Sequence, residues 1–343
     1  MTSSRDSVLW LSESDVASLM DIGEAIAALE AGLFEESQGQ AQNMVKTHVE
    51  WGAGATLHAI GAVFPKRGFA GTKTWPHTNS GATPLLVLFD SNNGQLRAIV
   101  EAFALGQLRT AAASGVATRC LASPEANEFA VIGTGKQAMT QVAAVLAVRP
   151  VRRIRVFSPN PEHRAQFAER VRSEFEIESV AASSVREAVH GASIITIATR
   201  ASEPVLSADM VGRGAHINSI GAIVPSRAEV SRDVLARATQ VVTDSIPQAQ
   251  KLSRELIDFF GATPAGWGPV RPLAEVAASR FKRAASDDLT LFKSLGVGVS
   301  DLSLGIALYE RALERNLGNR IAQPQKVSPR LRKTEMATTR RGA

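Results

Sequence analysis

The chain has 343 residues, of which 45% are hydrophobic and 21% are charged, a size and composition that suit a globular protein of about two domains. It contains no apolar run long enough to span a bilayer, and its first residues do not resemble a secretory signal, so we expect no membrane partner. The only cysteine, Cys120, cannot form an internal disulfide. We interpret it as a small buried residue of a cytoplasmic protein.

The formal net charge of +5 comes from one end of the chain. Residues 324–343 contain six Lys or Arg residues and one Glu, which accounts for the whole excess, so residues 1–323 are neutral. Because this stretch lacks apolar periodicity, we expect a disordered basic tail. The neutral remainder argues against nucleic acid as a partner.

The first third of the chain predicts a sheet with flanking helices. A short strand at 8–11 is followed by two helix starts with capping boxes, Ser12 with Asp15 and Asp21 with Glu24. Strand-like segments follow at 56–64, 69–75, 83–90 and 91–100, the last with an Asn-Gly turn typical of a hairpin. These segments predict an antiparallel or mixed sheet. The Ala-rich segment 106–122 predicts a helix that leads to a second domain.

From residue 128 onward, apolar strands alternate with amphipathic helices, which predicts a doubly wound parallel sheet of the Rossmann type, and hence an α/β fold. The predicted strands are 128–133, 153–158, 178–182, 193–199, 215–221 and 240–245. The predicted helices are 136–148, 161–174, 184–190 and 231–237. We expect a Gly/Pro-rich loop at 261–272 and a last helix at 301–318 that ends at Gly318.

A glycine-rich turn joins the first of these strands to its helix. Gly133-x-Gly135-x-x-Ala138 has the spacing that lets backbone N–H groups and a helix N-terminus hold a pyrophosphate. A purely structural strand-to-helix corner is the alternative. The run of strand–helix units favours NAD(P), and the predicted coenzyme contacts in this turn are Gly133, Thr134, Gly135, Lys136, Gln137 and Ala138.

The end of the second strand bears on the choice of coenzyme. NAD-binding folds usually place Asp or Glu there, about 20 residues after the turn, whereas this chain has Ser158 and Asn160, with Arg164 nearby. The absence of a carboxylate and the presence of Arg164 favour NADP(H), although Arg164 is also typical of an exposed helix residue. Thr199, Ser219 and Gly221 lie at the carboxyl ends of later strands, where a coenzyme is expected.

Seven blocks in order resemble the ornithine cyclodeaminase/μ-crystallin family: EAGLFEESQGQ, GTKTW, LGQLRTAAASGVAT, VIGTGKQA, GAHINSIGA, VVTDS and LFKSLGVGVSD. They extend over nearly the whole globular chain. The resemblance implies a Rossmann domain (121–300) joined to an α+β domain (1–120 with 301–323) that binds substrate and forms a homodimer. It also implies hydride transfer at a carbon that bears both nitrogen and carboxylate.

The resemblance also implies which residues touch the substrate. Lys73 in GTKTW matches a family lysine that contacts the substrate carboxylate and lies near the reacting centre, and Arg109 in GQLRTAAA matches a carboxylate-binding arginine. Lys46 lies near the position of a further cationic contact. His77 follows Lys73 closely and is either an acid, a polar contact or a loop residue without a role. No metal site is expected.

One position departs from the ornithine-deaminating members. Where they carry an Asp that handles the substrate amine and the attacking water, this chain has Ile223. The leading prediction is therefore an NAD(P)-dependent oxidoreductase that acts on a small imino or amino acid, such as a ketimine reductase or an amino-acid dehydrogenase. The alternatives are a cyclodeaminase-type ammonia-lyase and a non-catalytic NADPH-dependent binding protein.

Overall fold

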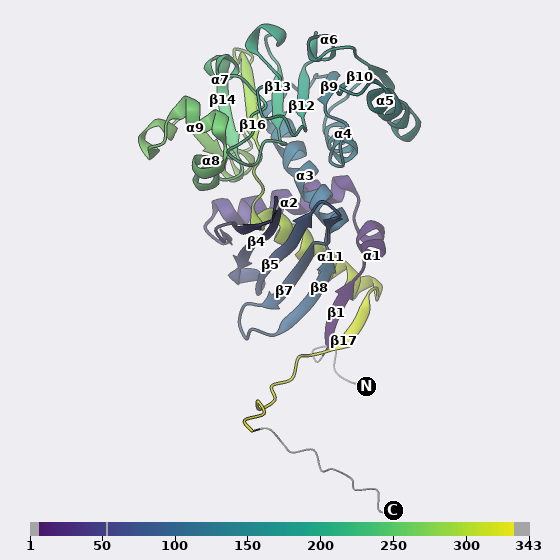
Figure 1. Cartoon of the computed structure of the whole chain (residues 1–343), viewed down its shortest axis with the longest axis vertical. Helices are drawn as coiled ribbons and strands as arrows, with labels where there is room; N and C mark the ends of the chain where they lie inside the picture. The colour runs from purple at the N-terminus through teal and green to yellow at the C-terminus, as the bar shows by residue number, and fades with distance from the viewer. Residues whose placement is uncertain (1–6, 53, 333–343) are drawn as a thin grey trace, which may run out of the picture.

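The structure is a computed structural model that describes residues 7–52 and 54–332. Two sheets lie one above the other, the N-terminal one below and the other above in Figure 1. Within the predicted tail, residues 324–332 form no helix or strand, and the remaining residues lie outside the described part.

The lower sheet has nine strands in the order β17-β1-β8-β7-β5-β4-β2, with β3 also paired to β4 and β6 to β5. Its pairs are antiparallel except β1 with β8, so it is a mixed sheet. The Asn-Gly prediction is confirmed, because β7 and β8 pair on either side of that turn. The strands are β1 (Ser7–Leu11), β2 (Gln42–Asn43), β3 (Thr47–Trp51), β4 (Ala55–Phe64), β5 (Phe69–Thr78), β6 (Gly81–Ala82), β7 (Leu85–Asp90), β8 (Leu96–Glu101) and β17 (Asn319–Ala322).

Three helices accompany this sheet: α1 (Glu13–Leu19), α2 (Ile22–Ser37) and α11 (Gly298–Arg315). Both predicted capping boxes are present, so each of the first two helices begins where the sequence indicates. The last helix ends earlier than predicted, because Asn316, in the left-handed conformation with φ of 55°, already caps it, two residues before Gly318. α11 and α2 pack behind the sheet, and its front face has no helix over it (Figure 1).

The upper sheet has eight strands, all parallel, in the order β11-β10-β9-β12-β13-β16-β14-β15. The six predicted strands are confirmed as β9 (Glu128–Ile132), β10 (Arg153–Phe157), β11 (Glu178–Ala181), β12 (Ile194–Ile197), β13 (His216–Ser219) and β14 (Ala238–Thr243). Two more strands, β15 (Val270–Pro272) and β16 (Leu289–Lys293), were not predicted, and β15 lies inside the segment expected to be a loop. Strand order reverses at β9, so the crevice beside β9 and β12 is the place where such a sheet binds its ligand.

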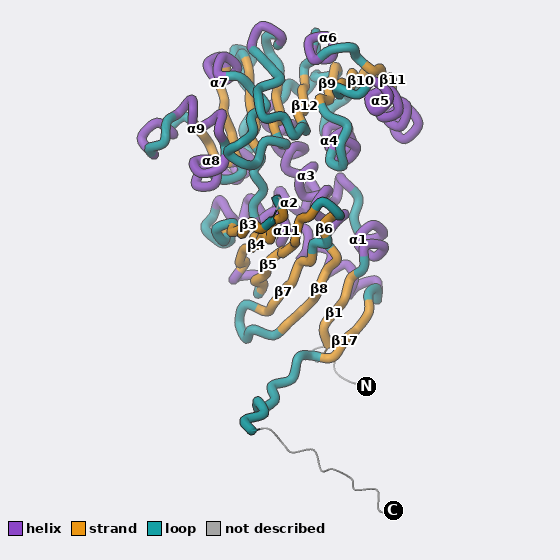
Figure 2. Tube along the Cα trace, in the orientation of Figure 1, coloured by secondary structure: helices purple, strands orange, loops and turns teal. Residues whose placement is uncertain are grey.

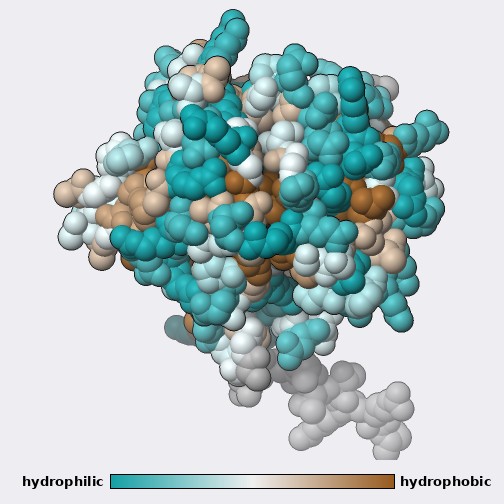
Figure 3. Space-filling model, turned by 90° about the horizontal axis from the view of Figure 1, so that it is seen from above, coloured by the Kyte–Doolittle hydropathy of each residue, from teal (hydrophilic) through white to brown (hydrophobic). Residues whose placement is uncertain are grey.

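Helices cover the upper sheet on both sides (Figure 2). They are α4 (Ala138–Leu146), α5 (Pro161–Phe175), α6 (Val185–Val189), α7 (Arg232–Arg237), α8 (Ile246–Leu252), α9 (Arg254–Phe260) and α10 (Leu273–Ala278). Short 3₁₀ turns occur at Pro65–Arg67, Ala208–Met210 and Pro264–Trp267. From above, the surface of this half is mostly hydrophilic, with smaller hydrophobic areas between (Figure 3).

The helix α3 (Phe103–Leu121) connects the two halves, as the Ala-rich segment predicts. It packs against α2 and α11 on one side and against α4, β13 and β16 on the other. Its small residues allow this close packing, and Gly115 is an example, because an added Cβ would lie 2.7 Å from Ile26. Cys120 lies on this helix, and partial burial raises the pKa of its thiol to about 11, which disfavours a reactive thiolate.

The structure contains no helix, within residues 7–52 and 54–332, with the length and apolar character needed to cross a membrane.

Candidate active site

Two of the predicted cations meet at one buried carboxylate between the halves of the molecule. Lys73, on β5, donates a short hydrogen bond through Nζ to Oδ1 of Asp301, on α11. The Nε atom of Arg109, on α3, lies 3.3 Å from the same oxygen. Asp301 is fully buried and Lys73 is only 3% exposed, so the ion pairs are shielded from water. The cluster therefore joins the sheet, α3 and α11 at a single point.

Arg109 also reaches the end of the upper sheet. A Cβ added to Gly296, in the loop after β16, would lie 2.6 Å from Nη1 of Arg109. The carboxylate of Asp244, after β14, accepts hydrogen bonds from the backbone N–H groups of Leu295 and Gly296 and holds this loop. Arg109 thus lies against the carboxyl ends of the parallel strands.

The electrostatics of the cluster are those of crowded, poorly hydrated cations. Burial, together with the charges of Arg109 and Lys46, lowers the pKa of Lys73 to about 8, against the opposing attraction of Asp301. Burial also lowers the pKa of Lys46 to about 8, with Arg109 adding to the effect. Among the described residues, Lys46 forms no ion pair. The three predicted cations therefore influence one another, and Lys46 alone has no carboxylate partner.

A row of rings lies on the sheet beside the lysines. His58 stacks between His48 and Trp75, with ring centroids 5.5 and 4.9 Å apart respectively. The Nζ of Lys73 lies 5.1 Å from the centre of the Trp75 ring. Burial and the nearby Lys46 lower the pKa of His58 to about 4, so this ring is neutral at physiological pH. The rings form a flat, largely uncharged wall next to the cations.

His77 lies further along β5, opposite Thr56, and is exposed. Its side chain forms no hydrogen bond or ion pair among the described residues, and Trp75 lies between it and Lys73 on the same face of the strand. Its role therefore remains a prediction.

The turn after β9 requires glycine at its first position and leaves its second glycine open. Gly133 has φ of 105°, and a Cβ there would lie 2.4 Å from the carbonyl oxygen of Ala198. Gly135 has open space where its Cβ would be, which leaves its backbone accessible. α4 begins at Ala138, which is fully buried, so the helix packs closely on the sheet. The Thr134, Lys136 and Gln137 positions lie in this loop, with Lys136 Nζ 5.7 Å from the Phe103 ring centre.

At the end of β10, Arg164 folds back over the strand. Its Nη1 donates to the carbonyl oxygen of Ser158 at 3.0 Å, and its guanidinium lies 5.7 Å from the Phe157 ring centre. Ser158 is buried, and the side chain of Asn160 caps α5 by accepting from the N–H of His163. A guanidinium therefore lies at the carboxyl end of this strand.

The ends of β12 and β13 are tied together by Glu229. Its Oε1 accepts from the N–H of Thr199 at 2.8 Å, and its Oε2 accepts from the hydroxyl of Ser219 at 2.8 Å and the N–H of Gly221 at 2.9 Å. Gly221 must be glycine here, because a Cβ would lie 2.1 Å from the Thr199 carbonyl oxygen. The three predicted residues Thr199, Ser219 and Gly221 therefore lie close together at the carboxyl ends of β12 and β13, next to the point where the strand order reverses.

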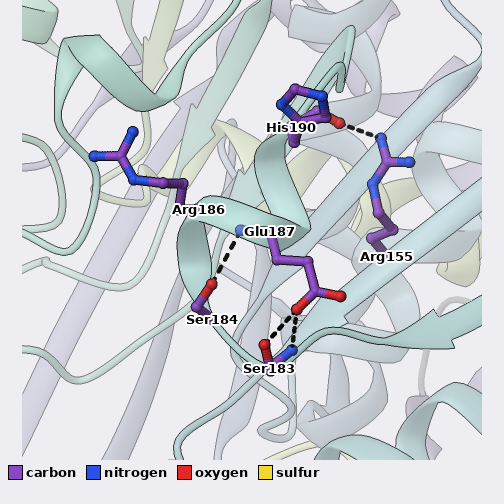
Figure 4. A pocket seen from close by; sticks show the side chains of 6 residues that line it. All are labelled: Arg155, Ser183, Ser184, Arg186, Glu187 and His190. Carbon is purple, nitrogen blue, oxygen red and sulfur yellow. Dashed lines mark hydrogen bonds between the residues drawn. The ribbon is translucent and has the colours of Figure 1, made fainter.

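A surface hollow near α6 is separate from this site (Figure 4). Its charged groups are already paired: Glu187 accepts from Ser183, and Arg155 donates to the carbonyl oxygen of His190. It is lined by Arg155, Ser183, Ser184, Arg186, Glu187 and His190.

Several residues of the site were not predicted individually. Asp301 and Asp244 lie in sequence blocks that carried the resemblance, yet neither was singled out. The available signal was an acidic residue next to an apolar run, because a charge that is buried usually has a partner. His58 gave no such signal, since its stacking depends on the register between β3, β4 and β5.

A doubly wound parallel sheet with a glycine turn at its switch point defines a Rossmann-type protein, and here a cluster of buried charges lies between this sheet and the second one. A family model described as the ornithine cyclodeaminase/mu-crystallin family matches residues 7–316. The chain belongs to this family, as the sequence blocks predict.

Relatives with assigned activities agree with this assignment. A Delta(1)-pyrroline-2-carboxylate reductase of Bacillus cereus is 29% identical, over 92% of this chain and 99% of the relative. The structure of the Thermococcus litoralis Delta(1)-pyrroline-2-carboxylate reductase in complex with NADH and L-proline superposes with a TM-score of 0.85, at 29% identity, over 92% of this chain and all of the other. The structure of an archaeal alanine dehydrogenase dimer with bound NAD has a TM-score of 0.84 and 27% identity, over 92% of this chain and 99% of the other.

Proposed function

We propose that this protein is an NAD(P)-dependent oxidoreductase that reduces a small imine carboxylate to an amino acid. The observation that carries the proposal is the meeting of Lys73 and Arg109 at buried Asp301, against the carboxyl ends of the Rossmann strands. The relatives named above, which act on pyrroline-2-carboxylate and alanine, support the same class of reaction.

The charge of the cluster favours a substrate with one carboxylate. Three cations, Lys46, Lys73 and Arg109, outnumber the two buried carboxylates that interact with them, Asp244 and Asp301, and burial with the charge of Asp244 raises the pKa of nearby Glu36 to about 7. Lys46 has no ion pair of its own, and buried cations bind carboxylates strongly. In our proposal Arg109 and Lys46 hold the substrate carboxylate, which neutralises the site.

Lys73 is proposed as the proton donor. With a pKa of about 8 it is mostly protonated at pH 7, yet it releases a proton far more readily than an exposed lysine. Asp301 holds its ammonium group in place through the hydrogen bond. Lys73, or a water that it orders, would protonate the nitrogen of the C=N bond, and a nicotinamide coenzyme, when bound, supplies the hydride.

The residues of the glycine turn fit such a coenzyme. Gly133 takes a conformation in which a side chain would collide with Ala198, and Gly135 leaves room for a phosphate to approach the backbone. The proposed contacts extend through Thr134, Lys136, Gln137 and Ala138 to Thr199, Ser219 and Gly221. Ser158, Asn160 and Arg164 at the end of β10 favour NADP(H), because a guanidinium suits a 2′-phosphate and none of these three side chains is acidic.

Ile223 limits the substrates that fit. It is partly buried and packs with the core of the upper sheet, where an acid of the ornithine-deaminating relatives would be expected. An apolar side chain neither binds a second ammonium group nor activates water. We therefore propose cyclic imines or alanine-like imines rather than ornithine as substrates, and we place cyclodeamination second.

We also propose a homodimer formed through the open face of the lower sheet. Large apolar side chains are exposed on this face, including Val49, Trp51, Leu57 and Phe89, which are 37 to 58% exposed. A patch of this kind marks an association surface. A second copy that covers it would leave the cation cluster, on the opposite side of the sheet, free.

The test is oxidation of NADPH and NADH by the purified protein with a panel of substrates. The panel contains cyclic imine carboxylates, α-keto acids mixed with ammonia or methylamine, and L-ornithine. We expect coenzyme oxidation with an imine carboxylate and none with the matched imine that lacks the carboxylate. Conversion of L-ornithine to proline and ammonia without net coenzyme change would replace the proposal with the lyase. Coenzyme binding without turnover of any imine would favour the binding protein.

A further inference from the structure

A second buried charge cluster lies at the end of the upper sheet, apart from the proposed substrate contacts. Lys293, the last residue of β16, is fully buried, as is Glu229, and Glu255 on α9 is 6% exposed. The Nζ of Lys293 lies 2.9 Å from Oε1 of Glu255 and 4.0 Å from Oε2 of Glu229. It also donates to the Ser219 hydroxyl at 3.0 Å. One ammonium group therefore faces two carboxylates in a space shielded from water.

Hydrogen-bond donors surround the carboxylate of Glu229. Each of its carboxylate oxygens accepts a backbone N–H, from Thr199 and from Gly221, and backbone N–H groups only donate. Glu255 forms the direct ion pair with Lys293, and its second oxygen, Oε2, is buried with no hydrogen-bond partner among the described residues. Lys293 and Glu255 cancel, so the cluster keeps the negative charge of Glu229.

The cluster of Glu229, Glu255 and Lys293 lies near the expected position of the nicotinamide half of the coenzyme. The phosphates belong at the turn after β9 and the adenosine ribose at the end of β10, so the other half of a dinucleotide extends toward β12 and β13. Thr199, Ser219 and Gly221, which Glu229 binds, are the residues at those strand ends. The net charge therefore lies directly behind the edge that the nicotinamide half would meet.

We propose that the Glu229–Glu255–Lys293 cluster tunes the coenzyme site in favour of the oxidised coenzyme, and so promotes hydride delivery to the substrate. This inference rests on the proposed function. When the ring gives up a hydride, the C–H bond moves with its electron pair to the imine carbon, and the ring gains one positive charge. A buried negative charge stabilises that product more than the neutral reduced ring, because low-dielectric surroundings screen it weakly.

The test compares the dissociation constants of NADP⁺ and NADPH, measured by titration calorimetry, for the full-length protein and for Glu255→Gln. The ratio of the two constants is informative because the phosphates and the adenosine are common to both forms. Removal of one negative charge is expected to weaken the binding of NADP⁺ about three- to tenfold relative to the binding of NADPH. Glu229→Gln makes the same charge change from another position and should shift the ratio in the same direction.

Asp209→Asn is the matched control, because it removes one carboxylate from an exposed site at Ala208–Met210 that pairs with Arg186. It should leave the ratio unchanged. If the role of Glu255 were only structural, its replacement would weaken the binding of NADP⁺ and NADPH equally. An unchanged ratio of the two dissociation constants in both Gln variants would therefore overturn the inference. If the unmodified protein bound neither NADP(H) nor NAD(H), the proposed function would be contradicted instead.

Discussion

Replacement of Asp301 by Asn should remove the proton supply of the proposed reaction at neutral pH. The substitution keeps the size of the side chain and deletes the charge that holds Lys73 and Arg109. Loss of an opposite charge in contact with an ammonium group lowers its pKa by about 1–3 units. Lys73 starts at a pKa of about 8, so the variant value would fall to about 5–7.

The expected decrease in kcat/KM follows from the fraction of Lys73 that is protonated. With a pKa of about 8, roughly 90% of Lys73 is protonated at pH 7, whereas a pKa lowered by about two units leaves roughly 10%. We therefore expect kcat/KM for a cyclic imine carboxylate to fall about tenfold at pH 7 and to recover as the pH is lowered toward 5.5. In the unmodified protein, the rate should decline only above about pH 8.

The assay is the pH profile of kcat/KM with NADPH in excess. Asp90→Asn serves as a control, because Asp90 is 5% exposed and pairs with Arg97 in the same sheet but far from the cluster. Its profile should match that of the unmodified protein. If Asp301→Asn kept a decline near pH 8, Lys73 would not be the titrating proton donor and the reasoning would be refuted.

Three further predictions test other parts of the account. Arg109→Ala should raise KM for the imine carboxylate by about ten- to a hundredfold, because a charge-assisted hydrogen bond is lost, while the NADPH dissociation constant stays constant; unchanged kinetics would remove Arg109 from the site. Arg164→Ala should weaken NADPH binding by about tenfold with little effect on NADH, and equal effects on both would exclude a 2′-phosphate contact. Burial lowers the pKa of His216 from 6.5 to about 3, so the unfolded chain binds the extra proton between these values and stability declines as pH falls below 6.5. Between pH 7 and pH 4, the free energy of unfolding should decrease by about 3 kcal/mol less for His216→Gln than for the unmodified protein, as measured by denaturant unfolding. Equal decreases in the two proteins would contradict this prediction.

The local elements of this fold could be predicted from the sequence because their signals are local. The capping residues Ser12 and Asp21 mark two helix starts, and the Asn-Gly turn marks a hairpin, each through groups a few residues apart. β16 escaped prediction because it has only five residues and ends in Lys293, a charge that a buried strand usually lacks. Its charge is tolerated only because Glu255 lies beside it, 38 residues earlier in the chain.

The site shows the same limit more clearly. Sequence motifs indicated Lys73 and Arg109, but not the carboxylate they share, because Asp301 is 228 residues from Lys73 and joins it only through the packing of α11 on β5. The stacked row of His48, His58 and Trp75 likewise depends on strand register. The sequence gives the chemical type of each side chain, whereas only the tertiary structure determines which groups a buried charge contacts.

The most direct test of the account is the fate of the hydride. The protein would be supplied with NADPH that carries deuterium at C4 of the nicotinamide, on each face in turn, and with a cyclic imine carboxylate. The account predicts one deuterium in the amino acid product, on the carbon that bears nitrogen and carboxylate, from only one of the two labelled forms. Product formed without deuterium from either form would contradict hydride transfer at this site.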